Sequence, residues 1–290
     1  MLLRTAWFTL DDMNEIELSA GTLQNIDSGG DGPTVVLLHG LLMDASLWDG
    51  VIANISTDCR CIAPTLPFGA HRRPMNPDAD LSLPGIAGMV SEFLERLDLQ
   101  DVVLVGNDTG GVVAQLVMRD GAKRVGRVVL ASCEAFDNLP PGLTGKALAL
   151  AGKLSPTLFG VFMQQMRLKA VRRLPVAFGT LTKRGDAATA RWIRPLLEQP
   201  EIRPETVRML RAVFADATLL DATAKELTTF DRPALVVWAA DDRVMPLDHG
   251  RRLAGLLPEA QFTTVDDSYT LIPLDQPAEL ARLIRGFALR

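Results

Sequence analysis

The sequence predicts an α/β fold built on a mostly parallel sheet. Short apolar runs alternate along the chain with amphipathic stretches of helical period, which is the pattern of repeated strand–helix units. The 290 residues are 48% hydrophobic and 22% charged, a globular composition that excludes a disordered or fibrous protein. This length fits one large α/β domain or two small domains, and no repeat or low-complexity linker divides it.

Apolar patterns and turn residues place the elements of the N-terminal half in order. Residues 16–26 indicate two strands around Ala20 and Gly21, which we expect to form an antiparallel hairpin at the sheet edge. A loop rich in Pro and Gly interrupts the pattern between residues 64 and 84. The other predicted elements are strands at 34–38 (TVVLL), 59–63, 102–105 (VVLV) and 128–131, and helices at 46–55, 83–97 and 111–119.

The strand pattern stops between about residues 136 and 228. Apolar residues recur there with a period near 3.6, as in LFGVFMQQMRL and VRMLRAVFADATLL. Alternation then resumes with strands at 234–238 and 262–265 and helices at 253–257 and 278–287. We therefore expect a core domain of residues 1–135 and 229–290, and a helical insertion at 136–228 that includes the helix returning to the sheet.

Charge and cysteine usage argue against several classes of function. The net charge is −5 and no long basic stripe occurs, so we expect no nucleic-acid partner. The three cysteines form no C-x-x-C pair and three histidines complete no zinc pattern, so we expect buried reduced thiols and no metal. No apolar run approaches the ~20 residues needed to span a bilayer, and the first residues lack a sustained apolar region. We therefore expect a cytoplasmic protein with no membrane partner.

The strongest chemical signal is the segment GNDTGG at residues 106–111. It lies between an apolar strand and a helix, the context of a nucleophile elbow that lifts one side chain above the sheet. Gly106 and Gly110 stand two residues on either side of Asp108, where such a turn leaves no room for a Cβ atom. The structural alternative is a turn in which Asp108 only caps the helix. The motifs that follow favour the elbow.

With these residues the chain resembles the α/β-hydrolase superfamily over its whole length. His39-Gly40 after a strand matches the family's oxyanion turn, Trp48 follows it, and residues 240–246 (ADDRVMP) match the family's acid loop. The resemblance implies an eight-stranded, mostly parallel sheet flanked by helices, with the insertion forming a helical cap over the site. An aspartate at the elbow is similar to the branch that contains epoxide hydrolases and haloalkane dehalogenases.

The resemblance also implies roles for particular residues, and it implies no cofactor. Asp108 would attack an sp³ carbon, Asp242 would be the acid that orients a base, and the N–H groups of Leu41 and Thr109 would hold the oxyanion. Such chemistry needs a dry apolar pocket. Packing within the cap is the alternative for most of its candidate lining residues, which are Phe159, Phe162, Met163, Met166, Phe178 and Trp192.

The family's catalytic histidine is missing from its usual place. That base normally stands in a G-H pair some seven residues before the proline of an E-x-P motif. Here Asp275-Gln276-Pro277 supplies the motif, and Thr270 stands where the histidine is expected. The single tyrosine lies outside the insertion, and Thr109 replaces the tryptophan that dehalogenases of this branch carry after the nucleophile. Neither epoxides nor haloalkanes, the two substrate classes of the branch, are therefore specifically indicated by these residues.

Three histidines lie elsewhere in the sequence. We expect His39 to be a hydrogen-bonded structural residue, and His249 to lie on the surface of the helix after the acid loop. His71, in the Pro-rich loop, is expected to reach the mouth of the site. These three, with Asn107 and Thr270, are further candidates for catalysis or substrate binding.

We therefore expect a hydrolase, monomeric or homodimeric, that uses Asp108 on a small or medium apolar substrate. The first alternative is a cofactor-free elimination, isomerisation or cyclisation with Asp108 as general acid and base. The second is a capped pocket that binds a small ligand without catalysis. A covalent adduct on Asp108 would support the hydrolase, turnover without an adduct the first alternative, and binding without turnover the second.

Overall fold

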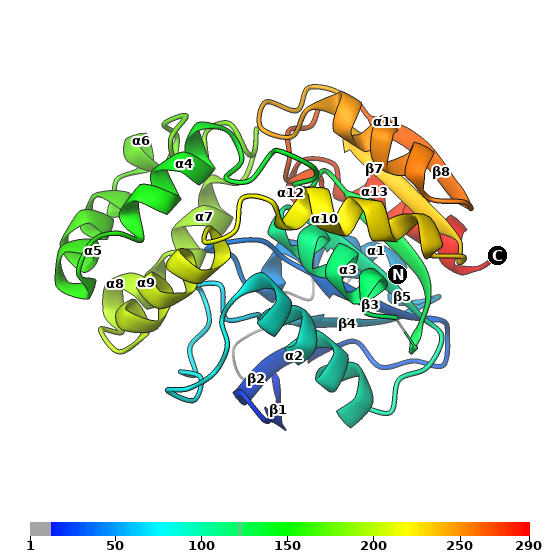
Figure 1. Ribbon diagram of the computed structural model, residues 1–290, viewed down its shortest axis with the longest axis horizontal. Helices are drawn as coiled ribbons and strands as arrows, with labels where there is room; N and C mark the ends of the chain where they lie inside the picture. Colours follow the sequence, from blue (N-terminus) through cyan, green and yellow to red (C-terminus); the bar gives the residue numbers. More distant parts are fainter. Residues whose placement is uncertain (1–12, 122) are drawn as a thin grey trace, which may run out of the picture.

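The computed structural model describes residues 13–121 and 123–290, and an eight-stranded sheet forms its centre (Figure 1). The strand order is β1-β2-β4-β3-β5-β6-β7-β8; β1 and β2 are antiparallel to their neighbours, and the rest of the sheet is parallel. The predicted fold class is confirmed. The strands are β1 (Asn14–Leu18), β2 (Gly21–Asp27), β3 (Thr34–Leu38), β4 (Arg60–Pro64), β5 (Val102–Asn107), β6 (Val125–Ala131), β7 (Ala234–Ala239) and β8 (Ala260–Val265).

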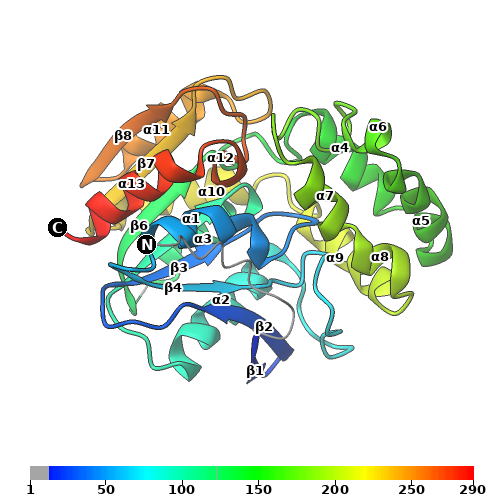
Figure 2. The same ribbon diagram turned by 180° about the vertical axis from the view of Figure 1, so that it is seen from behind.

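The central parallel strands are apolar along their length because helices cover both faces of the sheet. One face carries α2 (Leu83–Arg96), α3 (Thr109–Arg119), α10 (Leu219–Glu226) and α11 (Leu247–Leu256) (Figure 1). The opposite face carries α1 (Asp49–Ile55) and α13 (Pro277–Ala288), which pack on each other (Figure 2). Two short helices, η2 (Ala45–Trp48) and α12 (Ile272–Asp275), precede them in the chain.

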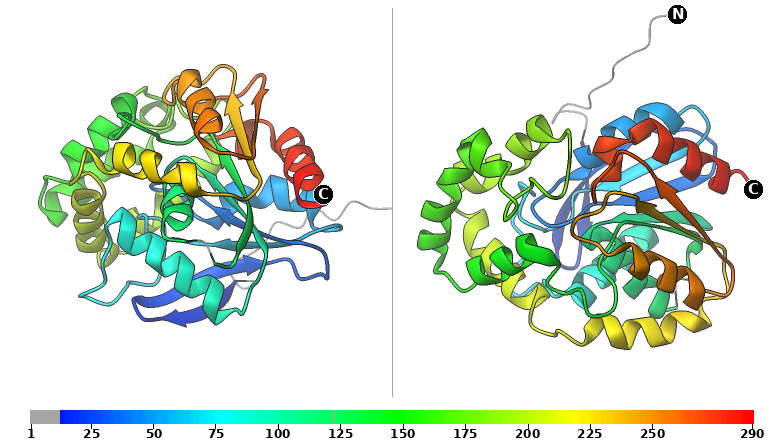
Figure 3. Two further views of the ribbon diagram at one scale, coloured as in Figure 1. Left: turned by 45° about the vertical axis from the view of Figure 1, so that its right-hand side comes forward. Right: turned by 90° about the horizontal axis from the view of Figure 1, so that it is seen from above.

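Only helices and loops lie between β6 and β7 in this fully described stretch of the chain. They gather beside one end of the sheet in every view (Figures 1 and 3). α10 then returns to the sheet and packs on α3. The helices of this insertion are α4 (Gly142–Ala151), α5 (Pro156–Met163), η3 (Gln164–Arg167), α6 (Lys169–Arg172), α7 (Asp186–Trp192), α8 (Arg194–Glu198) and α9 (Ile202–Val213).

Several local predictions are confirmed at the level of single elements. The β1–β2 hairpin forms the sheet edge with Ile16 opposite Leu23. Cys59, Cys61 and Cys133 are free thiols in buried positions. The helix predicted from residue 111 begins two residues earlier, because the elbow turn is tighter than the sequence indicated. Among the described residues, no helix is long and apolar enough to cross a membrane.

Candidate functional site

The loops that follow four parallel strands meet at one edge of the sheet, where the carboxyl ends of these strands lie. Leu41 follows β3, Asp108 follows β5, Glu134 follows β6 and Asp242 follows β7. In open α/β sheets this edge is where ligands bind, because the connecting loops diverge there and leave a crevice. The helical insertion lies over the same end of the sheet (Figure 3).

Asp108 lies at the sharp turn between β5 and α3. Its backbone has φ 55° and ψ −138°, a strained conformation for a residue with a side chain. The flanking glycines are required by close approach: a Cβ on Gly106 would lie 2.3 Å from the Gly110 carbonyl oxygen, and one on Gly110 would lie 2.2 Å from that of Leu38. The turn therefore holds Asp108 above the sheet edge by contacts that only glycine permits.

The Asp108 carboxylate lies against two backbone donors. The N–H of Thr109 donates to Oδ1 at 2.8 Å, so Asp108 also caps α3, and the N–H of Leu41 faces the same carboxylate and lowers its pKa. A Cβ on Gly40 would lie 2.0 Å from Oδ1, which explains a glycine in that turn. The two N–H groups that the resemblance implies as oxyanion donors thus face one carboxylate. Burial raises the pKa of Asp108 despite these donors.

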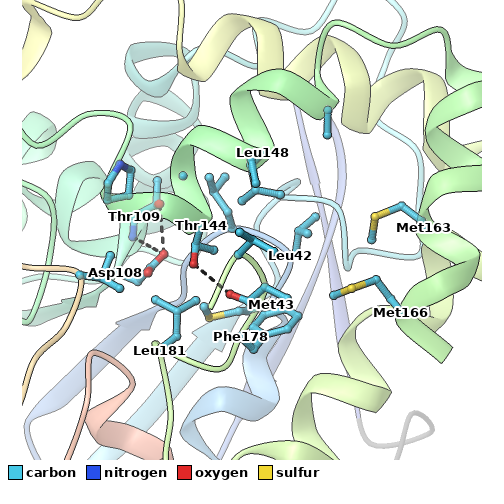
Figure 4. Close-up of a pocket in the computed structure, with 18 of the residues that line it drawn as sticks. Leu42, Met43, Asp108, Thr109, Thr144, Leu148, Met163, Met166, Phe178 and Leu181 are labelled. Atoms are coloured by element: carbon cyan, nitrogen blue, oxygen red, sulfur yellow. Dashed lines mark hydrogen bonds between the residues drawn. The ribbon is translucent and has the colours of Figure 1, made fainter. Parts of the chain in front are cut away.

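An apolar cavity opens from Asp108 toward the helical insertion. Asp108 and Thr109 lie at one end and Met163 and Met166 at the other (Figure 4). The cavity offers about 110 Å³ to the centres of water-sized molecules, which is room for a small ligand. Of the six candidate lining residues, the cavity is bordered by Phe162, Met163, Met166 and Phe178.

Phe159 and Trp192 do not line this cavity, so that part of the prediction is wrong. Phe159 is fully buried on α5, which packs against α8 and α9. Trp192 is also fully buried, and its Nε1–H donates to Ser46 Oγ at 2.9 Å, which ties the insertion to η2. Helical periodicity identifies an apolar face, but it does not tell whether that face meets a cavity or another helix.

Glu134 is a residue of this site that the sequence reasoning missed. It is fully buried and borders the cavity, and its Oε1 lies 2.8 Å from the Thr109 hydroxyl. The same hydroxyl lies 3.2 Å from Asp108 Oδ1, while Glu134 Oε2 has no hydrogen-bond partner among the described residues. Burial and then the Asp108 charge raise the pKa of Glu134 well above its ordinary range. The available signal was an acid three residues after the predicted strand at 128–131.

Asp242 and Thr270 lie together, as the resemblance implies for the acid and base positions, but away from the cavity wall. Asp242 Oδ1 accepts hydrogen bonds from Val244 N at 2.9 Å, Met245 N at 2.8 Å and Thr270 Oγ1 at 2.8 Å. Burial raises the pKa of Asp242. Neither side chain borders the cavity. This arrangement closes the acid loop onto the loop that carries Thr270.

Asn107 joins this region to the sheet and does not border the cavity. Its Nδ2 donates to the carbonyl oxygens of Thr270 and Ala131, both at 2.8 Å, and the residue is fully buried. Asn107 therefore makes no contact with the cavity that would support its candidate role in catalysis or substrate binding. Asn107 instead holds the Thr270 loop at the end of β5.

The histidines lie in three separate structural settings, and none borders the cavity. His39 is fully buried: Leu66 N–H donates to Nε2 at 2.8 Å, so Nδ1 donates to the Gly40 carbonyl at 2.9 Å. Burial lowers the pKa of His39 to about 4, so the ring is neutral at pH 7. The structural role expected for His39 agrees with these contacts.

The predictions for His71 and His249 are wrong. His71 does not reach the mouth of the cavity, because its Nε2 lies 2.6 Å from Oε1 of Glu205 on α9 and its ring is buried. His249 is mostly buried instead of lying on the surface: its side chain is 12% exposed and packs edge-on to Phe136. Each ring is held by packing that involves residues distant in the sequence.

A comparison with known proteins identifies the family. The model of a family described as the alpha/beta hydrolase fold matches residues 33–277. The chain belongs to the α/β-hydrolase fold family. Haloalkane dehalogenase 2 of Mycobacterium tuberculosis (strain ATCC 25618 / H37Rv) is 25% identical to this α/β-hydrolase over 270 residues, 92% of this chain and 91% of that protein.

Other relatives of this α/β-hydrolase have different names. An uncharacterized protein of the same Mycobacterium tuberculosis strain is 26% identical over 275 residues, 89% of this chain and 76% of that protein. The crystal structure of the enol-lactonase from Burkholderia xenovorans LB400 superposes with a TM-score of 0.73 at 17% identity, covering 96% of this chain and 100% of that one. The latter likeness is one of fold, so the reaction has to be argued from the site.

Proposed function

We propose that this α/β-hydrolase uses Asp108 as a nucleophile on an sp³ carbon of a small or medium apolar substrate. The observation that carries the proposal is the Asp108 carboxylate at the end of an apolar cavity, with Oδ1 held by a backbone N–H. A carboxylate fixed in this way presents its second oxygen to a ligand in the cavity. The named dehalogenase relative supports attack on a carbon that carries a leaving group.

The two backbone donors would act in the second step of this reaction. Attack gives an ester on Asp108, and water attacking that ester places negative charge on the carbonyl oxygen. The N–H of Thr109 already donates to this carboxylate and that of Leu41 faces it, so both are placed to stabilise the charge. One such donor is typically worth about 10²–10³-fold in rate.

The helical insertion, residues 136–228, would serve as the cap over this site. Apolar side chains of this insertion form most of the cavity wall, and this wall excludes water from the attacking carboxylate. Asp242 would support the acid loop through its three hydrogen bonds, since it does not border the cavity. Thr270 would stand in the family's position for the base, where a hydroxyl has no proton affinity near neutral pH.

A covalent adduct tests the proposal. The protein is incubated with 1-bromohexane and quenched in acid, and peptide mass spectrometry locates any hexyl ester. We expect the ester on Asp108 in the wild type and none in Asp108→Asn. Because no imidazole borders the cavity among the described residues, the ester should accumulate. Turnover without an adduct would favour the acid–base alternative, and binding without either would favour a ligand-binding protein.

A further inference from the structure

We propose that Glu134 is a second catalytic residue, the acid that protonates a leaving oxygen, so that the substrates of this site are apolar epoxides. The inference rests on the proposed role of Asp108 and adds the substrate class to it. Three independent features support it: the number of protons available to Thr109, the residues of the cavity wall, and the proton balance of the reaction.

The Thr109 hydroxyl requires a proton on one of the two carboxyl groups beside it. Its Oγ1 lies 2.8 Å from Glu134 Oε1 and 3.2 Å from Asp108 Oδ1, and a hydroxyl has a single hydrogen to donate. With both carboxyls ionised, one of these contacts would bring two oxygen lone pairs together. With Glu134 protonated, Glu134 donates to Thr109 and Thr109 donates to Asp108. Asp108 can then stay ionised for attack.

Glu134 is the acid of this pair, because its surroundings favour the neutral form. Asp108 accepts from the N–H of Thr109 and is faced by that of Leu41. Glu134 has its own N–H beside the carboxyl, but its Oε2 has no partner among the described residues. An ionised buried carboxylate with one oxygen lacking donors is costly, and protonation reduces that cost. The raised pKa of Glu134, caused by burial and by the Asp108 charge, agrees with this assignment.

The cavity wall offers no other acid for a leaving oxygen. Among the described residues that border the cavity, Asp108 and Glu134 are the only titratable ones. The Thr144 hydroxyl also borders it, but lies 3.0 Å from each of the carbonyl oxygens of Pro175 and Ala177. A substrate that needs a proton on its leaving atom therefore depends on Glu134.

Epoxide opening balances with the protons that these two residues hold. Asp108 forms a bond to an epoxide carbon, the carbon–oxygen bond breaks toward oxygen, and that oxygen takes the proton of Glu134. This leaves a 2-hydroxyalkyl ester on Asp108 and an ionised Glu134. The loss of the Asp108 charge makes the ionised form of Glu134 less costly than before. The site thereby forms a carboxylate base at the moment when the ester must be hydrolysed.

The second step restores both residues. Ionised Glu134 takes one proton from the water that attacks the ester carbonyl. The tetrahedral intermediate then breaks its bond to the alkyl oxygen, which takes the proton of the newly formed Asp108 carboxyl group, so a diol leaves. Asp108 ends ionised and Glu134 protonated. An alkyl halide leaves as an anion without taking a proton, so Glu134 stays protonated and provides no base for the ester.

The matched control for Glu134 is Glu205, a second buried glutamate outside the cavity. Glu205 Oε1 lies 2.6 Å from His71 Nε2, and its Oε2 accepts from Met75 N at 2.9 Å, so both oxygens have partners. Glu205→Gln therefore makes the same chemical change in a carboxyl group that holds the fold and does not touch the cavity. Glu134→Gln keeps the shape and a hydrogen bond to Thr109 but has no proton to transfer.

The experiment compares two six-carbon substrates, 1,2-epoxyhexane and 1-bromohexane, with enzyme in excess. In Glu134→Gln we expect epoxide consumption to fall by about 10²–10⁴-fold and bromide consumption to change less than about threefold. Glu205→Gln should leave the ratio of the two rates unchanged. In the wild type, epoxide consumption should fall at alkaline pH as Glu134 loses its proton, while bromide consumption should not.

The outcomes separate this inference from the proposed function. If the wild type consumes neither substrate and forms no ester, Asp108 is not the nucleophile and both proposals fail. If bromide gives the Asp108 ester but Glu134→Gln slows both substrates equally, or neither, the role of Glu134 is overturned and that of Asp108 stands. If Glu134→Gln does not fold, the wild-type pH profiles decide: parallel profiles for the two substrates overturn the inference.

Discussion

Two corners of the same sheet edge hold buried carboxyl groups but differ in their access to the cavity. In the Asp108 corner (Asp108, Thr109 and Glu134) the acids border an open cavity, and one carboxyl oxygen has no partner among the described residues. In the Asp242 corner (Asp242, Thr270 and Asn107) the side chains bond to loop backbone and to each other, away from the cavity. Asp242 Oδ2 and Asn107 Oδ1 there also have no partner among the described residues. Both corners thus contain unpartnered oxygens, and the feature that separates candidate reactive groups from supporting groups is access to the open cavity.

The largest expected contrast comes from neutralising the acid of each corner. Asp108→Asn should reduce alkylation by 1-bromohexane by on the order of 10⁴-fold or more, because the attacking oxygen is lost. Asp242→Asn should reduce it less than about tenfold, because Asp242 does not contact the cavity. Single-turnover rates for both variants, with circular dichroism to confirm folding, check this. Equal losses in the two variants would contradict the division into corners.

Much of the fold and part of the site could be predicted because the signals are local. The spacing of Gly106, Asp108 and Gly110 sets the backbone of one turn, and the turn fixes the side chain. The strands 34–38 and 102–105 are buried on both faces, so their apolar runs are continuous. Even the contact of Asp242 with Thr270 followed from counting residues along two loops that leave neighbouring strands.

The remaining features depend on partners that are distant in the sequence. His71 is directed by Glu205, 134 residues later, and nothing near His71 identifies that partner. Glu134 gains its chemistry from burial beside Thr109, which no spacing along the chain reveals. Phe159 and Phe162 lie on one short helix, yet only Phe162 borders the cavity, since the division depends on where α8 and α9 pack.

A histidine at position 270 would test whether the Asp242 corner is closed. Thr270 is fully buried, and its loop is held by Asn107 on one side and by a hydrogen bond from Leu271 N to Leu181 O on the other. We expect Thr270→His to be destabilised by about 1–3 kcal/mol from overpacking and to hydrolyse the Asp108 ester less than tenfold faster. Denaturant unfolding and ester decay measure the two effects. A gain of about 10²-fold or more would show that this corner opens onto the cavity.

The smallest expected effect is a pH-dependent gain in stability when Glu134 is neutralised. Because the pKa of Glu134 is raised above its ordinary value of 4.5, the folded state binds more protons than the unfolded state above that pH. The free energy of unfolding of the wild type therefore falls as pH rises from about 4.5 toward the folded pKa. Glu134→Gln lacks this loss, so its advantage should grow with pH and vanish near pH 4.5.

Thermal unfolding of both glutamate variants from pH 4.5 to 8.5 measures this effect. In a chain of 290 residues, each kcal/mol by which Glu134→Gln increases the free energy of unfolding should raise Tm by about 2–4 °C. Glu205→Gln should instead lose about 1–3 kcal/mol at neutral pH, because an amide turns a donor toward His71 Nε2 or Met75 N, which need an acceptor. Equal destabilisation of both variants would mean that Glu134 is ionised and well bonded in the folded protein, and the Asp108 corner would then lose the proton on which its proposed chemistry depends.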